Sequence, residues 1–282
     1  MAVLDALLLA ALLLASLLFS PFLAQSQAQS ASLSEIRRLA GLDPDGREAG
    51  ALPAELACEV AQAIETGRVV KQDLFLALRW YYLAATLGSP QAQFAMALAY
   101  DMGRLVDRDP EAALRWYTLA AQGGVPEAQR DLCVSYHYGQ GVRKNETMAV
   151  RWCSLAAEKG FAEAQLFLGD AYYYGRGVRR DLKKSFEWYN QAAENGNIPA
   201  WLALGYAWEK GEGVSKHLRN AVYCYTVAAE AGNPQAQFFL AEALYNGRGV
   251  GRDRKKAMEW YARAAKGGDR EARRRLSQLG RR

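Results

Sequence analysis

Histidine and cysteine, the residues that most often build catalytic and metal sites, are scarce in this sequence. Two histidines and four cysteines occur among 282 residues, and His137 and His217 have no neighbours at metal-ligand spacing. The metalloprotease pattern H-E-x-x-H, the pair C-x-x-C and the nucleophile motif G-x-S-x-G are all absent from the sequence. We therefore predict no catalytic residues, no metal site and no cofactor, and we expect that the protein is not an enzyme.

Charge of one sign is not in large excess either. The net charge is +5, with 51% apolar and 23% charged residues, which is close to ordinary globular averages. This composition excludes a disordered chain and an integral membrane bundle, and the small net charge argues against a nucleic-acid partner.

The one long uncharged hydrophobic run lies at the N-terminus, from Ala6 to Phe19. Ser26-Gln27-Ala28 places small residues at the two positions that a signal peptidase reads. We predict that residues 1–28 are a signal peptide, cleaved near Ala28, and that the protein is exported to the periplasm. The alternative is an uncleaved inner-membrane anchor, because residues 6–24 could nearly span a bilayer and no basic residue precedes the run.

A tryptophan recurs along the chain at a constant interval of 36 residues. The anchors are Trp80, Trp116, Trp152, Trp188 and Trp260, and Cys224 fills the vacant position. Each anchor is followed by paired alanines and then by a glycine. A fixed period of this length indicates a repeat architecture. We predict an N-terminal linker at 29–52, six repeats at 53–267, and a C-terminal capping helix with a basic tail at 268–282.

Each unit has the pattern of two helices. In one unit, Ala164, Leu168 and Tyr172 form an apolar stripe at a spacing of four, and a second stripe follows around Trp188. Gly175 suits a left-handed helix cap between them. A single helix pair cannot bury its stripe, whereas stacked pairs share a continuous core. The sequence therefore predicts an all-α solenoid of antiparallel helix pairs, with the anchor tryptophans buried between neighbouring helices.

Three motifs recur: A-x-x-x-L-G-x-x-Y, G-x-G-V-x-x-D and A-x-x-W-Y-x-x-A-A-x-x-G, best seen between Ala164 and Gly196. Over residues 53–279 the chain resembles the Sel-one-like repeat family, which is related to the tetratricopeptide repeat. The resemblance implies a right-handed superhelix that is used mostly as a scaffold for protein complexes. The sequence departs from the pattern at Leu105, Trp201, His217 and Cys224.

Some relatives in this family are linked to β-lactam binding or hydrolysis. No serine of this sequence is followed by lysine three residues later, so the serine-enzyme signature is absent. A β-lactam-binding or β-lactam-hydrolysing enzyme of the cysteine-rich repeat type is therefore an alternative only. A membrane-anchored assembly factor for an envelope polysaccharide or motility complex is a further alternative.

The cysteines raise the question of disulfides in an exported chain. Cys133 falls on the first helix of its unit and Cys153 on the second, at nearly equal distances from the loop at 139–145. An antiparallel pair would set them at the same height, so we predict a candidate disulfide between them. Cys58 and Cys224 lie several units apart and cannot meet. The alternative is four small buried thiols.

By resemblance to the tetratricopeptide superhelix, the first helix of each pair lines a concave face. The predicted partner-binding residues there are Phe94, Leu98, Asp101, Arg130, His137, Tyr138, Asp170, Tyr173, Tyr174, Tyr206, Glu209, Phe238 and Tyr245. Rigid aromatic residues beside a few charges are typical of interface hot spots. We predict a non-enzymatic scaffold or regulatory adaptor of the cell envelope that binds another protein or peptide; its oligomeric state stays open. The alternatives are that these tyrosines only complete the helix packing, or that the basic loops form an edge for an acidic partner.

Overall fold

The computed structural model describes residues 32–279, so the predicted signal peptide lies outside the described residues. Within this range every regular element is an α-helix. Two short helices come first, α2 (Leu33–Leu39) and α3 (Arg47–Gly50). The first helices of the six repeats are α4 (Ala54–Thr66), α6 (Pro90–Met102), α8 (Pro126–Tyr138), α10 (Ala162–Tyr174), α12 (Ile198–Lys210) and α14 (Pro234–Asn246). The second helices are α5 (Leu74–Thr86), α7 (Pro110–Gln122), α9 (Glu146–Glu158), α11 (Leu182–Glu194), α13 (Leu218–Glu230) and α15 (Arg254–Lys266), and α16 (Arg270–Leu279) ends the described chain.

The same capping residues at the helix ends give every repeat helices of the same length. Each of the twelve paired helices has 13 residues, and corresponding helices begin 36 residues apart. The first helix of a repeat ends at a glycine in the left-handed conformation, such as Gly175 with φ +69°, which an L side chain rarely adopts. The second helix then begins after an N-cap such as Asp181, whose carboxylate accepts the backbone N–H of Lys183 and Lys184.

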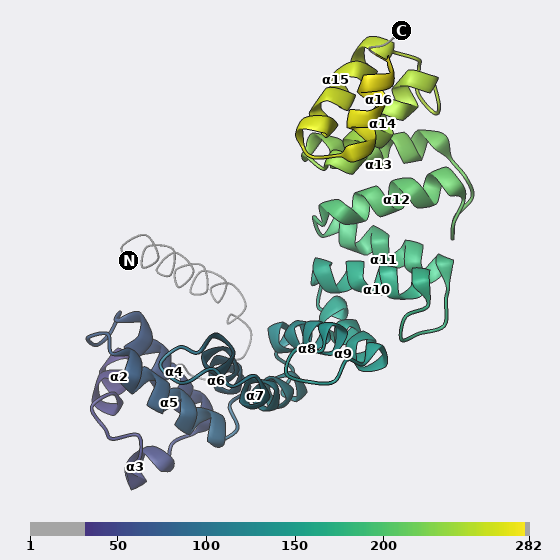
Figure 1. Ribbon diagram of the computed structural model, residues 1–282. Coiled ribbons are helices and arrows are strands. Elements are labelled where there is room, and N and C mark those ends of the chain that lie inside the picture. The colour runs from purple at the N-terminus through teal and green to yellow at the C-terminus, as the bar shows by residue number, and fades with distance from the viewer. Residues whose placement is uncertain (1–31, 280–282) are drawn as a thin grey trace.

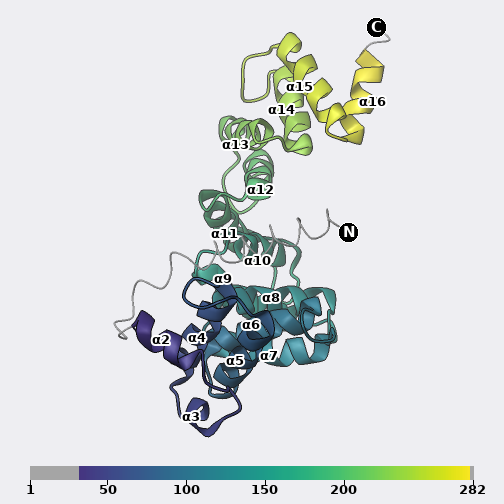
Figure 2. The same ribbon diagram turned by 90° about the vertical axis from the view of Figure 1, so that its left-hand side faces the viewer.

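The helix pairs stack side by side into an extended solenoid rather than a single ball (Figure 1). Each helix packs on its sequence neighbours, within the pair and between pairs. In Figure 1 the stack runs along the bottom from α2 to α7 and then turns upward through α8 and α9 to α16. The turned view of Figure 2 shows α16 at the far end of the array. The predicted all-α solenoid with a 36-residue period is confirmed.

The segment predicted as an N-terminal linker holds α2 and α3. Leu39 on α2 and Ala49 on α3 are buried and join the core cluster of the first repeat, beside Val60 and Ile64 of α4. These helices therefore cover the outer face of the first repeat. No helix within residues 32–279 is both long and apolar enough to cross a bilayer.

The anchor tryptophans are not equally buried. Trp80 is fully buried and Trp152 nearly so, but Trp116 is only partly buried and packs edge-on against Tyr82. The expectation that Trp116 is buried between helices was wrong. In this second repeat the residue that follows the anchor, Tyr117, is buried instead.

A buried tyrosine links the two helices in five of the six repeats. It follows the anchor position on the second helix, and its hydroxyl donates a hydrogen bond to a carboxylate of the first helix. The bonded pairs are Tyr81 with Glu65 (2.6 Å), Tyr117 with Asp101 (3.4 Å), Tyr189 with Asp170 (2.7 Å), Tyr225 with Glu209 (2.8 Å) and Tyr261 with Glu242 (2.5 Å). Burial first, and the neighbouring carboxylate second, raises the pKa of Tyr81 and of Tyr117 above the usual range.

The third repeat replaces this tyrosine with a disulfide. Cys153 occupies the tyrosine position and is bonded to Cys133, with the sulfur atoms 2.03 Å apart. Cys133 occupies the position where the other repeats have alanine or glycine to make room for the ring; at Gly169, an added Cβ would lie 2.3 Å from the ring of Tyr189. In the third repeat, two bonded cysteines therefore stand where the other repeats have a small residue packed against a tyrosine.

We expect thiol titration to find two free thiols in the denatured, unreduced protein and almost none in the native protein. The free thiols are Cys58 and Cys224, both buried, and burial raises the pKa of each to about 11, which keeps them protonated and unreactive. Replacing Cys133 and Cys153 with serine should lower the free energy of unfolding by about 3 kcal/mol, because the bond closes a loop of 20 residues. Four free thiols in the protein purified from an oxidising compartment would contradict the bond.

Two departures from the repeat pattern are absorbed locally. His217 still caps its helix, since its Nδ1 accepts the N–H of Asn220 at 3.2 Å. Leu105 adopts φ +63° at the position where Gly141 has φ +66°. A left-handed leucine costs about 1–2 kcal/mol, which the neighbouring contacts must offset.

A candidate partner-binding face along the first helices

The candidate face consists of the outward residues of α6, α8, α10, α12 and α14. The predicted binding residues all lie on these helices, and the 36-residue period places equivalent positions in rows along the array. The structure divides them into residues engaged in helix packing and residues open to solvent.

The engaged group holds the helix pairs together. Phe94 is 4% exposed and packs on Tyr117, so its side chain is not accessible to a partner. Leu98 packs against the same core cluster. Phe238 and Tyr245 both contact the ring of Tyr261. For these residues the alternative interpretation holds: their side chains complete the packing between helices.

The three predicted acidic residues are also engaged. Asp101, Asp170 and Glu209 each accept the hydroxyl of a buried tyrosine. Burial raises the pKa of Asp170, although the hydrogen bond from Tyr189 opposes the shift. The sequence pattern did not predict the tyrosine partners, but it contains a signal for them: a tyrosine follows the anchor position in every repeat except the third, where Cys153 follows it.

Arg130 and His137 lie at the edge of the core. Arg130 is paired with Asp131, at 2.7 Å. His137 Nδ1 lies 2.8 Å from Glu146 Oε2, and its ring packs edge-on between Tyr138 and Phe167. His137 is therefore engaged with Glu146 and packs on the ring of Tyr138. No group of three or more metal-ligating side chains exists within the part of the chain that the structure describes.

The open group forms a row of exposed side chains at the C-terminal ends of the first helices. Tyr138 is 68% exposed and Tyr174 is 57% exposed, and Met102 is similarly open. These three are each the last residue of their helix, one period apart, so they repeat along the same edge. Tyr206, one turn before the end of α12, is also exposed and lies beside Lys210.

The exposed rings are held in place by their neighbours. Tyr174 packs edge-on against Tyr173, and the guanidinium of Arg176 lies 4.5 Å from its ring centre. Tyr173 itself donates its hydroxyl to Glu212 of the next repeat, at 2.9 Å. A pre-positioned aromatic side chain loses little conformational freedom on binding, which favours affinity.

The basic loops are partly used by the fold. The Nε atoms of Arg108, Arg180 and Arg252 donate to the carbonyl oxygens of Asp101, Tyr173 and Tyr245, at 2.8 to 3.2 Å. These arginines satisfy the free carbonyl groups at the ends of the first helices. The predicted basic edge is therefore in part a set of helix caps.

The stacked helix pairs define a helical repeat protein. Family comparison finds the Sel1 repeat at 54–89, 90–125, 126–161, 162–197, 200–233 and 234–269. The chain therefore belongs to the Sel1 repeat family, as the sequence motifs indicated. Members of this family generally act as non-enzymatic scaffolds for protein–protein interaction.

Two of the solved structures that are similar to this chain share about a third of its residues. One is a protective antigen of uropathogenic Escherichia coli with an SLR fold, at 33% identity over 88% of this chain, with a TM-score of 0.73. This chain spans 51% of that antigen. The other is a Sel1 repeat protein from Oxalobacter formigenes, at 31% identity over 79% of this chain and 87% of the other, with a TM-score of 0.67. A search of the curated proteins finds no match.

Proposed function

We propose that this protein is an exported, periplasmic scaffold or adaptor without enzymatic activity, which binds another protein or a peptide through the exposed row of the first helices. The observation that carries the proposal is this row itself: Met102, Tyr138 and Tyr174 repeat with the period of the solenoid, yet the helix packing does not bury them. Large exposed side chains that repeat periodically on a rigid frame suit an extended partner.

Two features support export. The N-terminal run from Ala6 to Phe19 has the length and composition of a signal peptide. The bond between Cys133 and Cys153 belongs to the repeat core, and such structural disulfides persist in oxidising compartments.

Replacing Tyr138 and Tyr174 together with alanine is expected to weaken partner binding at least thirtyfold. Each exposed hot-spot tyrosine contributes about 1–2 kcal/mol, and about 1.4 kcal/mol is a tenfold change in affinity. The partner is first obtained by affinity capture on the purified protein, and its dissociation constant is then measured by calorimetry for each variant. Circular dichroism should show unchanged helix content, because both rings are exposed.

The matched control replaces Tyr82 and Tyr223 with alanine. Both rings are equally exposed, but they lie on the second helices α5 and α13. The control should bind normally. If it loses affinity while the variant of Tyr138 and Tyr174 keeps it, the binding face lies on the second helices and the proposal is wrong.

A further inference from the structure

A pocket of about 220 Å³ lies between the fifth and sixth repeats. Its lining includes Glu209, Val222, Tyr225, Phe239, Glu242 and Arg248. Most of its wall is apolar, and the rings of Tyr225 and Phe239 are stacked with their centres 5.1 Å apart. An apolar cavity of about 150 Å³ is enough to take up benzene. The pocket therefore has room for one leucine or phenylalanine side chain.

The two glutamates of the pocket are already paired. Glu209 accepts the hydroxyl of Tyr225 and an Nη of Arg248, both at 2.8 Å. Glu242 accepts the hydroxyl of Tyr261 and lies 3.0 Å from Nε of Arg275. These carboxylates are therefore poor sites for a cationic ligand. Their effect is to hold Arg248 at the wall of the pocket and Arg275, which does not line the pocket, behind Glu242.

The arginines keep donors for a partner. The side chain of Arg248 is 51% exposed and that of Arg275 33% exposed. A guanidinium has five N–H donors; Arg248 uses one of them for its hydrogen bond to Glu209, and Arg275 forms an ion pair with Glu242. Arg254 and Arg275 both lie over the ring of Tyr245, so a third guanidinium belongs to the same cluster. Such groups suit carboxylates, which they bind through paired hydrogen bonds.

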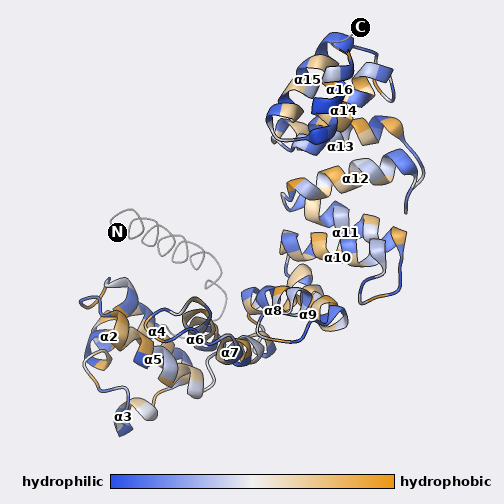
Figure 3. Ribbon diagram, in the orientation of Figure 1, coloured by the Kyte–Doolittle hydropathy of each residue, from blue (hydrophilic) through white to orange (hydrophobic). Residues whose placement is uncertain are grey.

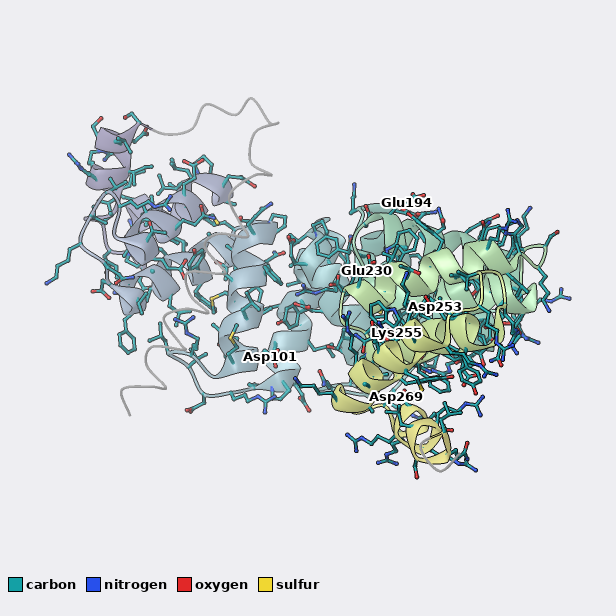
Figure 4. All side chains as sticks on the ribbon, turned by 90° about the horizontal axis from the view of Figure 1, so that it is seen from above. Asp101, Glu194, Glu230, Asp253, Lys255 and Asp269 are labelled. Atoms are coloured by element: carbon teal, nitrogen blue, oxygen red, sulfur yellow. A yellow bond between two sulfur atoms is a disulfide. The ribbon has the colours of Figure 1, made fainter. Side chains whose placement is uncertain are left out.

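The positive charge of the C-terminal end of the solenoid also favours binding of carboxylates. Residues 247–282 hold 13 of the 35 Lys and Arg residues but only 4 of the 30 Asp and Glu residues, a local net charge of +9. The remaining 246 residues carry a net charge of −4. Figure 3 shows α16 as mostly hydrophilic, and Figure 4 shows nitrogen-tipped side chains projecting around this end, near Asp253, Lys255 and Asp269. A field of this sign attracts acidic partners and repels basic ones.

A lipid surface fits this end less well than a peptide does. Peripheral helices that bind membranes combine basic residues with exposed apolar residues that insert. Among the described residues from 224 to 279, no large apolar side chain is exposed. The apolar surface at this end is instead the wall of the pocket, which has room for one side chain of a peptide.

We propose that the fifth and sixth repeats bind an acidic segment of the partner, in which one leucine or phenylalanine is flanked by glutamate or aspartate. The apolar side chain enters the pocket against Tyr225 and Phe239, and the flanking carboxylates bond to Arg248 and Arg275. This inference rests on the proposed scaffold function and names the chemistry of the segment that the C-terminal repeats recognise.

The test measures binding of a fluorescent peptide, Gly-Glu-Glu-Leu-Glu-Glu-Gly, to the purified protein by anisotropy. Arg248→Glu is expected to weaken binding at least tenfold, because it removes one contact and repels the probe. Val222→Phe fills the pocket and should weaken binding at least fivefold without changing the charge. The matched control is Arg219→Glu, an exposed residue of α13 that does not line the pocket. It changes the net charge equally and should leave binding within twofold.

Three results would overturn the proposal. One is no binding of the probe to the wild-type protein. Another is an equal loss of binding in the variants of Arg248 and Arg219, which would indicate unspecific attraction to a positive surface. The third is equal binding of probes with serine in place of leucine, or with lysines in place of the glutamates. A captured partner that needs Tyr138 and Tyr174 but is indifferent to Arg248→Glu and Val222→Phe leaves the scaffold function standing and removes only this inference.

Discussion

Trp80→Ala is expected to lower the free energy of unfolding by about 3–5 kcal/mol, the range for deleting a fully buried large aromatic side chain. Trp80 has no exposed surface and packs in the core cluster that joins α4, α5 and the N-terminal helices. Because each repeat contacts only its neighbours, the loss should be concentrated in the N-terminal repeats. Denaturant unfolding followed by circular dichroism measures the effect, and hydrogen exchange locates it.

Trp116→Ala is the matched control, since it removes the same side chain at the equivalent position of the next repeat. Trp116 is only partly buried, so we expect a smaller cost, about 1–2 kcal/mol. Equal losses in the free energy of unfolding at both positions would contradict the difference in burial between the two tryptophans.

The second large effect is a loss of stability in alkali. Burial, together with the bonded carboxylates, raises the pKa of Tyr81, Tyr117, Tyr189, Tyr225 and Tyr261 above the ordinary value in the folded protein. The unfolded chain releases these protons near pH 10, while the folded protein keeps them. Above pH 10 the unfolded state therefore binds fewer protons, and the free energy of unfolding falls as the pH rises.

Each tyrosine contributes a slope of up to about 1.4 kcal/mol per pH unit, so the five together contribute up to about 7 kcal/mol per unit. Stability should be nearly constant from pH 7 to 9 and fall steeply from pH 10 to 11, and these five tyrosines should ionise only on unfolding. Tyr189→Phe should reduce the slope by one tyrosine's share. Ionisation of all 15 tyrosines in a protein that keeps its helix content would contradict this explanation.

The period of the sequence was sufficient to predict the fold, because the signals for each element repeat in every unit. Glycine caps such as Gly175 and N-caps such as Asp181 mark the helix ends, and the helices begin and end where these residues place them. Burial of individual anchors could not be predicted in the same way. Trp80 and Trp116 have the same position in the repeat, yet Trp80 is fully buried and Trp116 only partly, because burial depends on the side chains that each meets on neighbouring helices.

The candidate face was predicted as one set of residues, but the structure divides it into open side chains and side chains engaged in helix packing. Tyr138 and Tyr174 at the helix ends are open, whereas Phe94 and Asp170 on the same helix surfaces are engaged with the second helix. The direction of a side chain at a helix end depends on the crossing of the two helices, which the spacing of residues does not give. Arg248 and Phe239 were not predicted as parts of a pocket because the pocket forms only where two repeats meet.

The claim that the first helices carry the binding face is tested most directly by site-specific photo-crosslinking. A photoreactive phenylalanine analogue is placed at Tyr174 in one protein and at Tyr223 in another, two exposed aromatic positions on α10 and α13. After irradiation with the captured partner, the account predicts a covalent adduct from position 174 and none from position 223. An adduct from position 223 and none from position 174 would contradict it.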